Sequence, residues 1–270
     1  MRRRRQRSAP LRWLRAARQS VRRFSRLLRL HADPFVSDPP AGVAERWIET
    51  RDGVRLHAWY APAARAAATL VWSHGTGVSI ARRPHLLRAL AARGLNVLAY
   101  DYRSCGRSGG RSWSERGLYL DALAAYDSER ARGVPPEHII SFGESIGGAV
   151  AVYLASRRPC AGLVVVSSCT RVRDVPRGIG PLWLLVRLNS IARIPGVRVP
   201  VFVAHGDRDR MFPFELGERL FAAANHPKTF FRAAGAGHDD VLASPGLLDA
   251  IAEFSSAAAA PPACARYANG

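Results

Sequence analysis

The sequence predicts an α/β protein with a mostly parallel central sheet and helices on both faces. Two observations predict this class: short, continuously apolar runs recur along the chain, and helical patterns separate most of them. A third observation concerns residues 169–198, which interrupt the alternation and are expected to form a small cap. The length of 270 residues is sufficient for one large domain with a substantial core.

The first thirty residues form a separate basic segment. They contain twelve arginines and no acid, so most of the net charge of +19 belongs to them. Apolar residues recur at steps of three and four from Leu11 to Leu28, which predicts an amphipathic helix. Such a helix could bind an anionic membrane surface, and we expect a cytoplasmic protein that lies at the periphery of a membrane. An organellar presequence and a helix packed on its own domain remain alternatives. Nucleic acid is not expected, because a basic arm supplies no base readout.

Residues 31–44 read as a proline-rich linker, and residues 45–256 as the main domain. The domain is expected to begin with a hairpin that turns at Arg51-Asp52-Gly53. The remaining strands are expected at 68–73, 96–101, 138–142, 162–167, 199–204 and 228–232. Helices are expected at 84–93, 117–132, 147–157, 214–224 and 245–254. Residues 257–270 read as a flexible tail.

Apolar residues also gather at the centre of the cap segment. Trp183, Leu184 and Leu185 lie there, and together with Met211 they could line an apolar substrate pocket. The alternative is that these residues pack the cap on itself, which is the more common role of apolar residues in a cap.

The four cysteines show no metal or redox spacing. Cys105, Cys160, Cys169 and Cys264 form no CxxC pair, so we expect ordinary thiols, no metal site and no cofactor. The chain also contains no run of eighteen or more apolar residues, so no transmembrane helix is expected.

The most informative stretch is "IISFGESIGGAVAVYLA", in which Ser145 stands between an apolar run and a helical run, with glycine two residues to either side. A serine on a sharp strand-to-helix turn has its hydroxyl exposed above the sheet. The backbone N–H of Ile146 would then lie at a helix N-terminus, where negative charge is stabilised. The pattern predicts a nucleophilic serine, provided that a base is nearby.

A base and an acid follow in the chain. His238 lies in a glycine-rich loop after the last expected strand, and Asp207 and Asp209 lie on the loop after the strand before it. Since the carboxyl ends of parallel strands share one edge of a sheet, these side chains can meet Ser145. Asp209, deeper in its loop, is the preferred acid, and Asp207 is expected to shape the turn.

With these segments in view, the chain resembles the α/β-hydrolase superfamily, and within it the small-cap serine hydrolases of the abhydrolase-domain type. The resemblance runs from about residue 45 to residue 243. It is carried by "RDGVRLHAWYAP", "WSHGTG", "DYRSCGRSGG", "GESIGGAVAVYLA", "VPVFVAHGDRDRMFP" and "FFRAAGAGHDDV". It implies the α/β-hydrolase fold, with Ser145 as nucleophile, Asp209 as acid and His238 as base. It also implies an oxyanion hole made by the backbone N–H groups of Thr76 and Ile146.

The chain departs from the family pattern after Asp-Tyr-Arg. Ser104 and Cys105 stand where the family usually has glycine and an aromatic residue, and we expect this change at the rim of the substrate pocket.

The function expected from these residues is hydrolysis of a small carboxylic ester or thioester through an acyl-enzyme intermediate. Two alternatives remain. The same triad could serve aminopeptidase-like or perhydrolase chemistry, or the chain could be a catalytically idle membrane-surface binding protein.

Overall fold

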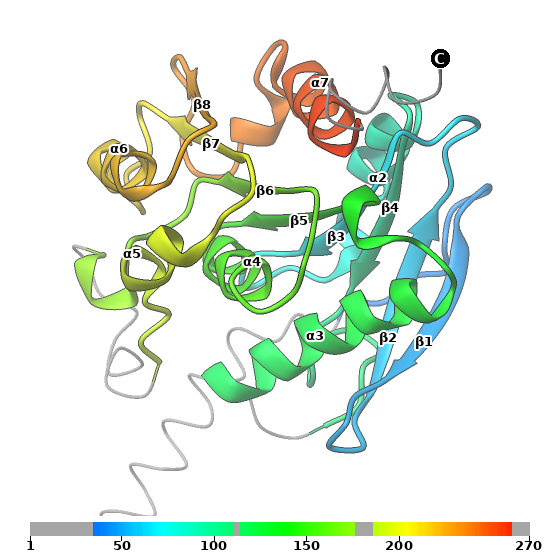
Figure 1. Cartoon of the computed structure of the whole chain (residues 1–270). Coiled ribbons are helices and arrows are strands. Elements are labelled where there is room, and N and C mark those ends of the chain that lie inside the picture. Colours follow the sequence, from blue (N-terminus) through cyan, green and yellow to red (C-terminus); the bar gives the residue numbers. More distant parts are fainter. Residues whose placement is uncertain (1–34, 111–113, 176–185, 261–270) are drawn as a thin grey trace, which may run out of the picture.

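The computed structural model describes residues 35–110, 114–175 and 186–260. These residues form an eight-stranded sheet with the order β1-β2-β4-β3-β5-β6-β7-β8, which confirms the predicted fold class (Figure 1). The strands are β1 (Ala44–Glu49), β2 (Arg55–Ala61), β3 (Ala68–Ser73), β4 (Leu95–Tyr100), β5 (Ile139–Glu144), β6 (Gly162–Val166), β7 (Val201–Gly206) and β8 (Lys228–Ala233).

The sheet is antiparallel only at one edge. β1 pairs with β2 and β2 pairs with β4 in antiparallel register, whereas the strands from β4 to β8 are all parallel. Every residue of β3, β5, β6 and β7 is buried, as expected for central strands that are covered on both faces. The carboxyl ends of these strands therefore share one edge, and the loops that leave them carry the candidate site.

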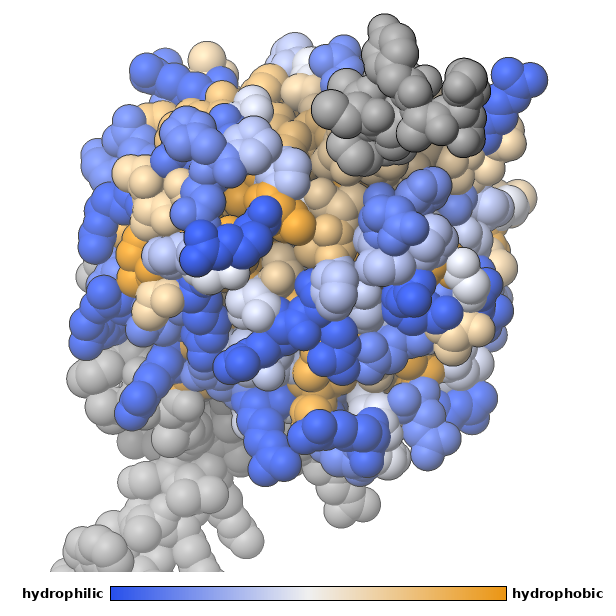
Figure 2. All heavy atoms as spheres, in the orientation of Figure 1, coloured by the Kyte–Doolittle hydropathy of each residue, from blue (hydrophilic) through white to orange (hydrophobic). Residues whose placement is uncertain are grey.

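Helices cover both faces of the sheet (Figure 1). On one face, α2 (Pro84–Ala91) and α7 (Leu247–Ala259) pack over a core that includes Trp59, Trp72 and Phe142. On the other face lie α3 (Glu115–Ala131), α4 (Ile146–Ala155), α5 (Ser190–Arg193) and α6 (Phe214–Ala223). The outer surface seen in Figure 2 is mainly hydrophilic, and its apolar groups are small and scattered.

Two predicted boundaries differ from the structure. Helix α7 continues to Ala259, beyond the expected end of the domain at residue 256, because the alanine run has high helix propensity and two prolines follow it. Part of the expected linker packs on the domain: the backbone carbonyl of Phe35 accepts a hydrogen bond from Ser79, and Asp38 forms an ion pair with Arg107.

The cap segment is only partly described. Its described parts contain short 3-10 helices at Val172–Asp174 and Ile194–Gly196, as well as α5. The expected pocket residues Trp183, Leu184 and Leu185 lie outside the described residues.

Candidate active site

Ser145 lies at a strained corner between β5 and α4. Its backbone has φ 54° and ψ −127°, a conformation that non-glycine residues rarely adopt. The Ser145 N–H donates to the carbonyl of Val166 on β6 at 2.9 Å, which ties the corner to the neighbouring strand. The backbone is therefore held in the geometry that the sequence pattern predicted for an exposed serine hydroxyl.

The flanking glycines allow the close approach of backbone that this corner needs. A Cβ added at Gly147 would overlap the carbonyl oxygen of Ser73 at the end of β3. A Cβ added at Gly143 would overlap the backbone of Gly147 itself. A side chain at Gly147 would thus force the start of α4 away from β3, and one at Gly143 would force it away from β5.

His238 lies between Ser145 and Asp209. Its Nε2 is 2.9 Å from Ser145 Oγ, and its Nδ1 is 2.7 Å from Asp209 Oδ2. The three residues come from the loops after β5, β7 and β8, so the sheet edge brings them together from distant parts of the chain. The Phe212 ring packs edge-on against the imidazole, with centroids 4.8 Å apart.

Asp209 is buried and remains ionised. Burial acts to raise its pKa, but hydrogen bonds with His205 and His238 and from the backbone N–H of Phe212 outweigh that effect and hold the pKa well below its ordinary value. The backbone N–H groups of Met211 and Phe212 each donate to its Oδ1 at 2.8 Å. A carboxylate with these partners can orient the imidazole and stabilise its protonated form.

Asp207, the other acid of this loop, has partners other than His238. It accepts a hydrogen bond from the Gly235 N–H at 2.7 Å and pairs with Arg232 at 3.1 Å. It therefore joins the β7 and β8 loops, in agreement with the turn-shaping role expected from the sequence.

Thr76 and Ile146 both lie close to Ser145. Ile146 is the first residue of α4, and Thr76 lines the same pocket as Ser145 and His238. The turn at Gly75 approaches the serine so closely that an added Cβ would lie 3.1 Å from Ser145 Cβ. This placement suits two N–H groups that converge on one substrate oxygen, which is the role the resemblance implies for them.

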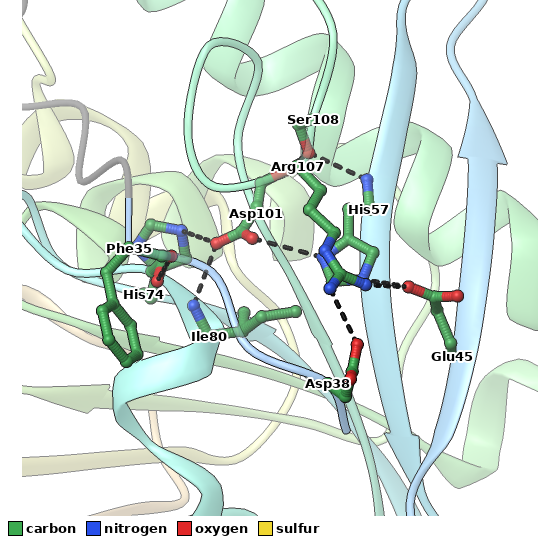
Figure 3. Close-up of polar contacts among 10 residues, drawn as sticks. Phe35, Asp38, Glu45, His57, His74, Ile80, Asp101, Arg107 and Ser108 are labelled. Atoms are coloured by element: carbon green, nitrogen blue, oxygen red, sulfur yellow. Dashed lines mark hydrogen bonds and ion pairs between the residues drawn. The ribbon is translucent and has the colours of Figure 1, made fainter.

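A buried carboxylate that the sequence reasoning missed holds the loop containing Thr76. Asp101 follows β4, and its Oδ1 accepts the Ile80 N–H at 2.9 Å and lies 3.7 Å from His74 Nε2 (Figure 3). His74 and Ile80 stand at the two ends of the loop, so Asp101 holds one end through a hydrogen bond and lies close to the histidine at the other. The signal was present in the sequence, since "WSHGTG" and "AYDYR" end two successive expected strands.

The Asp101 contact belongs to a longer network of polar contacts between side chains. Asp101 Oδ2 is 3.4 Å from His57 Nδ1, and His57 Nε2 is 2.9 Å from Glu45 (Figure 3). Arg107 donates to both Glu45 and Asp38, at 2.9 and 2.8 Å. This network of polar contacts links β1, β2 and the segment before them to the loop beside the nucleophile.

A small pocket of about 80 Å³ opens beside Ser145 and His238. Its walls include Met211, as expected from the sequence, and two residues that the sequence reasoning did not select, Arg83 and Glu144. Ser104 and Cys105 are not among its described lining residues, so their expected place at the rim of the substrate pocket stays a prediction. Both lie in the turn after β4, where the Cys105 N–H donates to Tyr102 and the Ser104 N–H to Gly109.

The described residues contain neither a cluster of metal-binding side chains nor a membrane-spanning helix. Within residues 35–110, 114–175 and 186–260, no group of three or more His, Cys, Asp or Glu side chains is arranged to hold a metal ion. Over the same ranges, no helix has the length and apolar character needed to cross a membrane.

Comparison with known proteins identifies the family. A family model described as "Serine aminopeptidase, S33" matches residues 64–195. An uncharacterized protein of Mycobacterium tuberculosis is 40% identical over 218 residues, which cover 77% of each chain. The α/β hydrolase domain-containing protein 17B of Xenopus laevis is 32% identical over 192 residues, covering 70% of this chain and 66% of that protein. The chain belongs to the α/β-hydrolase superfamily.

Solved structures of α/β-hydrolases agree on the fold. The Pyrococcus furiosus esterase Pf2001 superposes with a TM-score of 0.71 at 20% identity, covering 86% of this chain and 99% of the esterase. The α/β-hydrolase GrgF of Penicillium gives a TM-score of 0.69 at 18% identity, covering 80% and 98%. Sequence identities this low support a similarity of fold and nothing further. Membership of the superfamily supports hydrolase activity, which the sequence predicted.

Proposed function

We propose that the protein is a serine hydrolase that cleaves a carboxylic ester or thioester through an acyl-enzyme intermediate. The observation that carries the proposal is the continuous contact from Ser145 Oγ to His238 Nε2, at 2.9 Å, and from His238 Nδ1 to Asp209, at 2.7 Å. A hydroxyl is a weak nucleophile by itself, and an oriented imidazole is the group that activates it.

The proposed reaction has two steps. His238 takes the proton of Ser145 as its Oγ attacks the carbonyl carbon, and the Thr76 and Ile146 N–H groups stabilise the oxyanion. His238 then gives the proton to the departing alkoxide or thiolate, which leaves an ester between the acyl group and Ser145. In the second step, His238 deprotonates a water molecule that attacks this ester, the carboxylic acid departs, and the proton returns to Ser145 Oγ.

The electrostatics of the site support these roles. The pKa of Asp209 lies well below its ordinary range, so its carboxylate is negatively charged at neutral pH. This negative charge stabilises the positive charge that develops on His238 during the reaction. Each oxyanion donor in such sites is typically worth about 3–4 kcal/mol of barrier.

The test replaces the nucleophile. We expect Ser145→Ala to lower kcat/KM for p-nitrophenyl butyrate by at least about a thousandfold. Ser128→Ala, which removes a hydroxyl on α3 outside the site, is the matched control. A fluorophosphonate probe should label the wild-type protein on Ser145 only. Hydrolysis that survives in Ser145→Ala would disprove the mechanism, and absence of labelling in the wild type would favour the idle-site alternative.

A second candidate is hydrolysis of an aminoacyl amide, because the matching family model is described as a serine aminopeptidase. The same three residues would act, but His238 would have to protonate an amine, which is a much poorer leaving group than an alkoxide or thiolate. Rates on matched butyryl esters, butyryl thioesters and aminoacyl p-nitroanilides distinguish the two. A higher kcat/KM on the anilides would assign the aminopeptidase reaction.

We also propose that residues 1–30, which lie outside the described residues, bring the enzyme to an anionic membrane surface. The support for this is their twelve arginines, the absence of acids and the helical spacing of their apolar residues. Each arginine near such a surface contributes about 1 kcal/mol of attraction.

A further inference from the structure

The pocket beside Ser145 contains buried polar atoms that the proposed mechanism does not use. Arg83 Nε, Glu144 Oε1 and Ser167 Oγ are each buried without a hydrogen-bond partner among the described residues, and all three side chains line this pocket. Buried polar groups are normally paired, and leaving one unpaired destabilises the folded protein. Three such groups in one small pocket indicate a site that a ligand completes.

The geometry of Arg83 and Glu144 indicates which ligand atom fits. Arg83 Nε and Glu144 Oε1 are 3.7 Å apart, which is too far for a good hydrogen bond between them. It is also too close for one atom to sit on the line between them. A single oxygen to one side of that line can reach both at hydrogen-bond distance. It would accept the Nε–H of Arg83 and donate its own hydrogen to Glu144, which a hydroxyl group does.

The charges of the pair exclude charged ligand groups at this position. An ammonium group would be attracted by Glu144 but repelled by the guanidinium of Arg83. A carboxylate or phosphate would be repelled by Glu144. A neutral group that both donates and accepts meets neither repulsion. The Glu144 side chain is only 8% exposed, so water screens these interactions weakly.

The position of the pair places this group on the substrate. Glu144 is the residue before the nucleophile, at the end of β5, and Arg83 directly precedes α2 at the end of the loop that begins with His74. The remaining wall is mixed: it contains apolar side chains such as Val78 and Leu242 and the polar residues Thr76 and Asp239. A pocket of about 80 Å³ with both kinds of wall accommodates a short alkyl group that carries a hydroxyl.

We infer that the substrate is a short ester with a neutral hydroxyl group, which Arg83 and Glu144 bind beside Ser145. This inference rests on the proposed esterase function and specifies its substrate class. The hydroxyl can belong to the acyl group, as in a hydroxyacyl ester, or to the alcohol, as in a glycol ester. Ser167 Oγ, the third unpartnered atom, is a further contact available to it.

The experiment compares substrates that differ only in the hydroxyl. One pair is p-nitrophenyl 3-hydroxybutyrate and p-nitrophenyl butyrate, and the other is 2-hydroxyethyl butyrate and propyl butyrate. The readout is the ratio of kcat/KM within each pair, so an overall change in activity cancels. Hydrogen bonds to charged groups lead us to expect a ratio of about tenfold or more in one pair, and that pair tells whether the hydroxyl lies on the acyl or the alcohol side.

Substitution of Arg83 and Glu144 tests whether these two residues cause the preference for the hydroxylated substrate. We expect Arg83→Met to bring the ratio close to one, whereas Arg88→Met, an exposed arginine on α2, retains it. Glu144→Gln keeps the shape and an acceptor but removes the charge, so its ratio should fall between these two. It also serves as the second variant if Arg83→Met does not fold.

The outcomes separate this inference from the proposed function. Equal rates within both pairs for the wild type, with hydrolysis still lost in Ser145→Ala, would overturn the inference alone and make the pair a structural one. A preference that persists in both Arg83→Met and Glu144→Gln would also overturn it. Hydrolysis that persists in Ser145→Ala would overturn the proposed function itself.

Discussion

Substitution of Gly147 by alanine tests whether the approach of α4 to β3 sets the catalytic geometry. The added Cβ would overlap the carbonyl oxygen of Ser73 and lie 2.5 Å from that of His74. Since Cβ atoms in proteins stay at least about 3.0 Å from such oxygens, and the Ser73 oxygen would lie only 2.0 Å away, the helix start and the β3 end must separate by about 1 Å. Both obstacles are backbone, so no side-chain rotation relieves the overlap.

The separation would move Ile146 and Thr76, the expected oxyanion donors, away from each other. A displacement of about 1 Å in an active site costs on the order of a hundredfold in rate, and loss of one oxyanion donor costs about a hundred- to a thousandfold. We therefore expect kcat of Gly147→Ala to fall about a hundredfold. Overpacking of this kind also destabilises by about 1–3 kcal/mol, and each kcal/mol lowers Tm by about 2–4 °C in a chain of this size.

The assay is kcat for p-nitrophenyl butyrate, together with thermal unfolding followed by circular dichroism. Gly196→Ala is the matched control, because a Cβ at Gly196 meets nothing within 4 Å. It should leave kcat unchanged and Tm within a degree or two. If folded Gly147→Ala kept kcat within about threefold of the wild type, the claim that this contact positions the oxyanion donors would be refuted.

Three further predictions concern acid stability, thiol reactivity and membrane binding. The folded pKa of Asp209 is lowered, so its stabilisation is complete above about pH 4 and is lost as pH falls towards the folded pKa, by at most about 1.4 kcal/mol per unit. Urea unfolding between pH 6 and pH 3 should thus show a smaller loss in Asp209→Asn, and an equal loss would contradict the assignment. Burial raises the pKa of Cys160 and of Cys169 to about 12, so mass spectrometry should find both unmodified by iodoacetamide at pH 8 until urea is added, and labelling of the native protein would contradict their burial. The full chain should sediment with phosphatidylserine vesicles, less so as salt rises, and a chain without residues 1–30 should not; equal binding to neutral vesicles would count against the membrane proposal.

The fold was predictable because its strands and helices differ sharply in pattern. The central strands are apolar on both faces, so each appears as a short continuous run, and Ala68–Ser73 has the bounds that the sequence predicted. The order of β4 and β3 was not predictable, since it depends on which buried strands pair in space. The predicted strand that ended at Phe142 continues to Glu144, because pairing with β6 persists past Gly143.

The three proposed catalytic residues were predictable because each follows a strand in a short, recognisable motif. Their contacts required only that parallel strands end at one edge. Asp101 was not found, although it lies in a quoted motif, because its role depends on side chains from β2 and from the loop after β3. The local turn at Ser104, with a positive φ of 66° and a hydrogen bond from its N–H to the Gly109 carbonyl, was likewise not predictable from the family pattern.

The partners of three buried carboxylates at this edge of the sheet indicate that the three have different roles. Asp209 is satisfied by His238 and two backbone N–H groups, so it has no capacity left for a substrate and is suited to orient the imidazole. Asp101 accepts the Ile80 N–H and contacts two histidines, so it holds the loop beside the nucleophile. Glu144 alone of the three has a buried oxygen, Oε1, without a hydrogen bond among the described residues; its ion-pair contact with Arg83 Nε in the pocket is 3.7 Å long. Because a buried carboxylate oxygen without a hydrogen bond destabilises the fold, a substrate hydroxyl that binds Glu144 would account for this carboxylate beside the nucleophile.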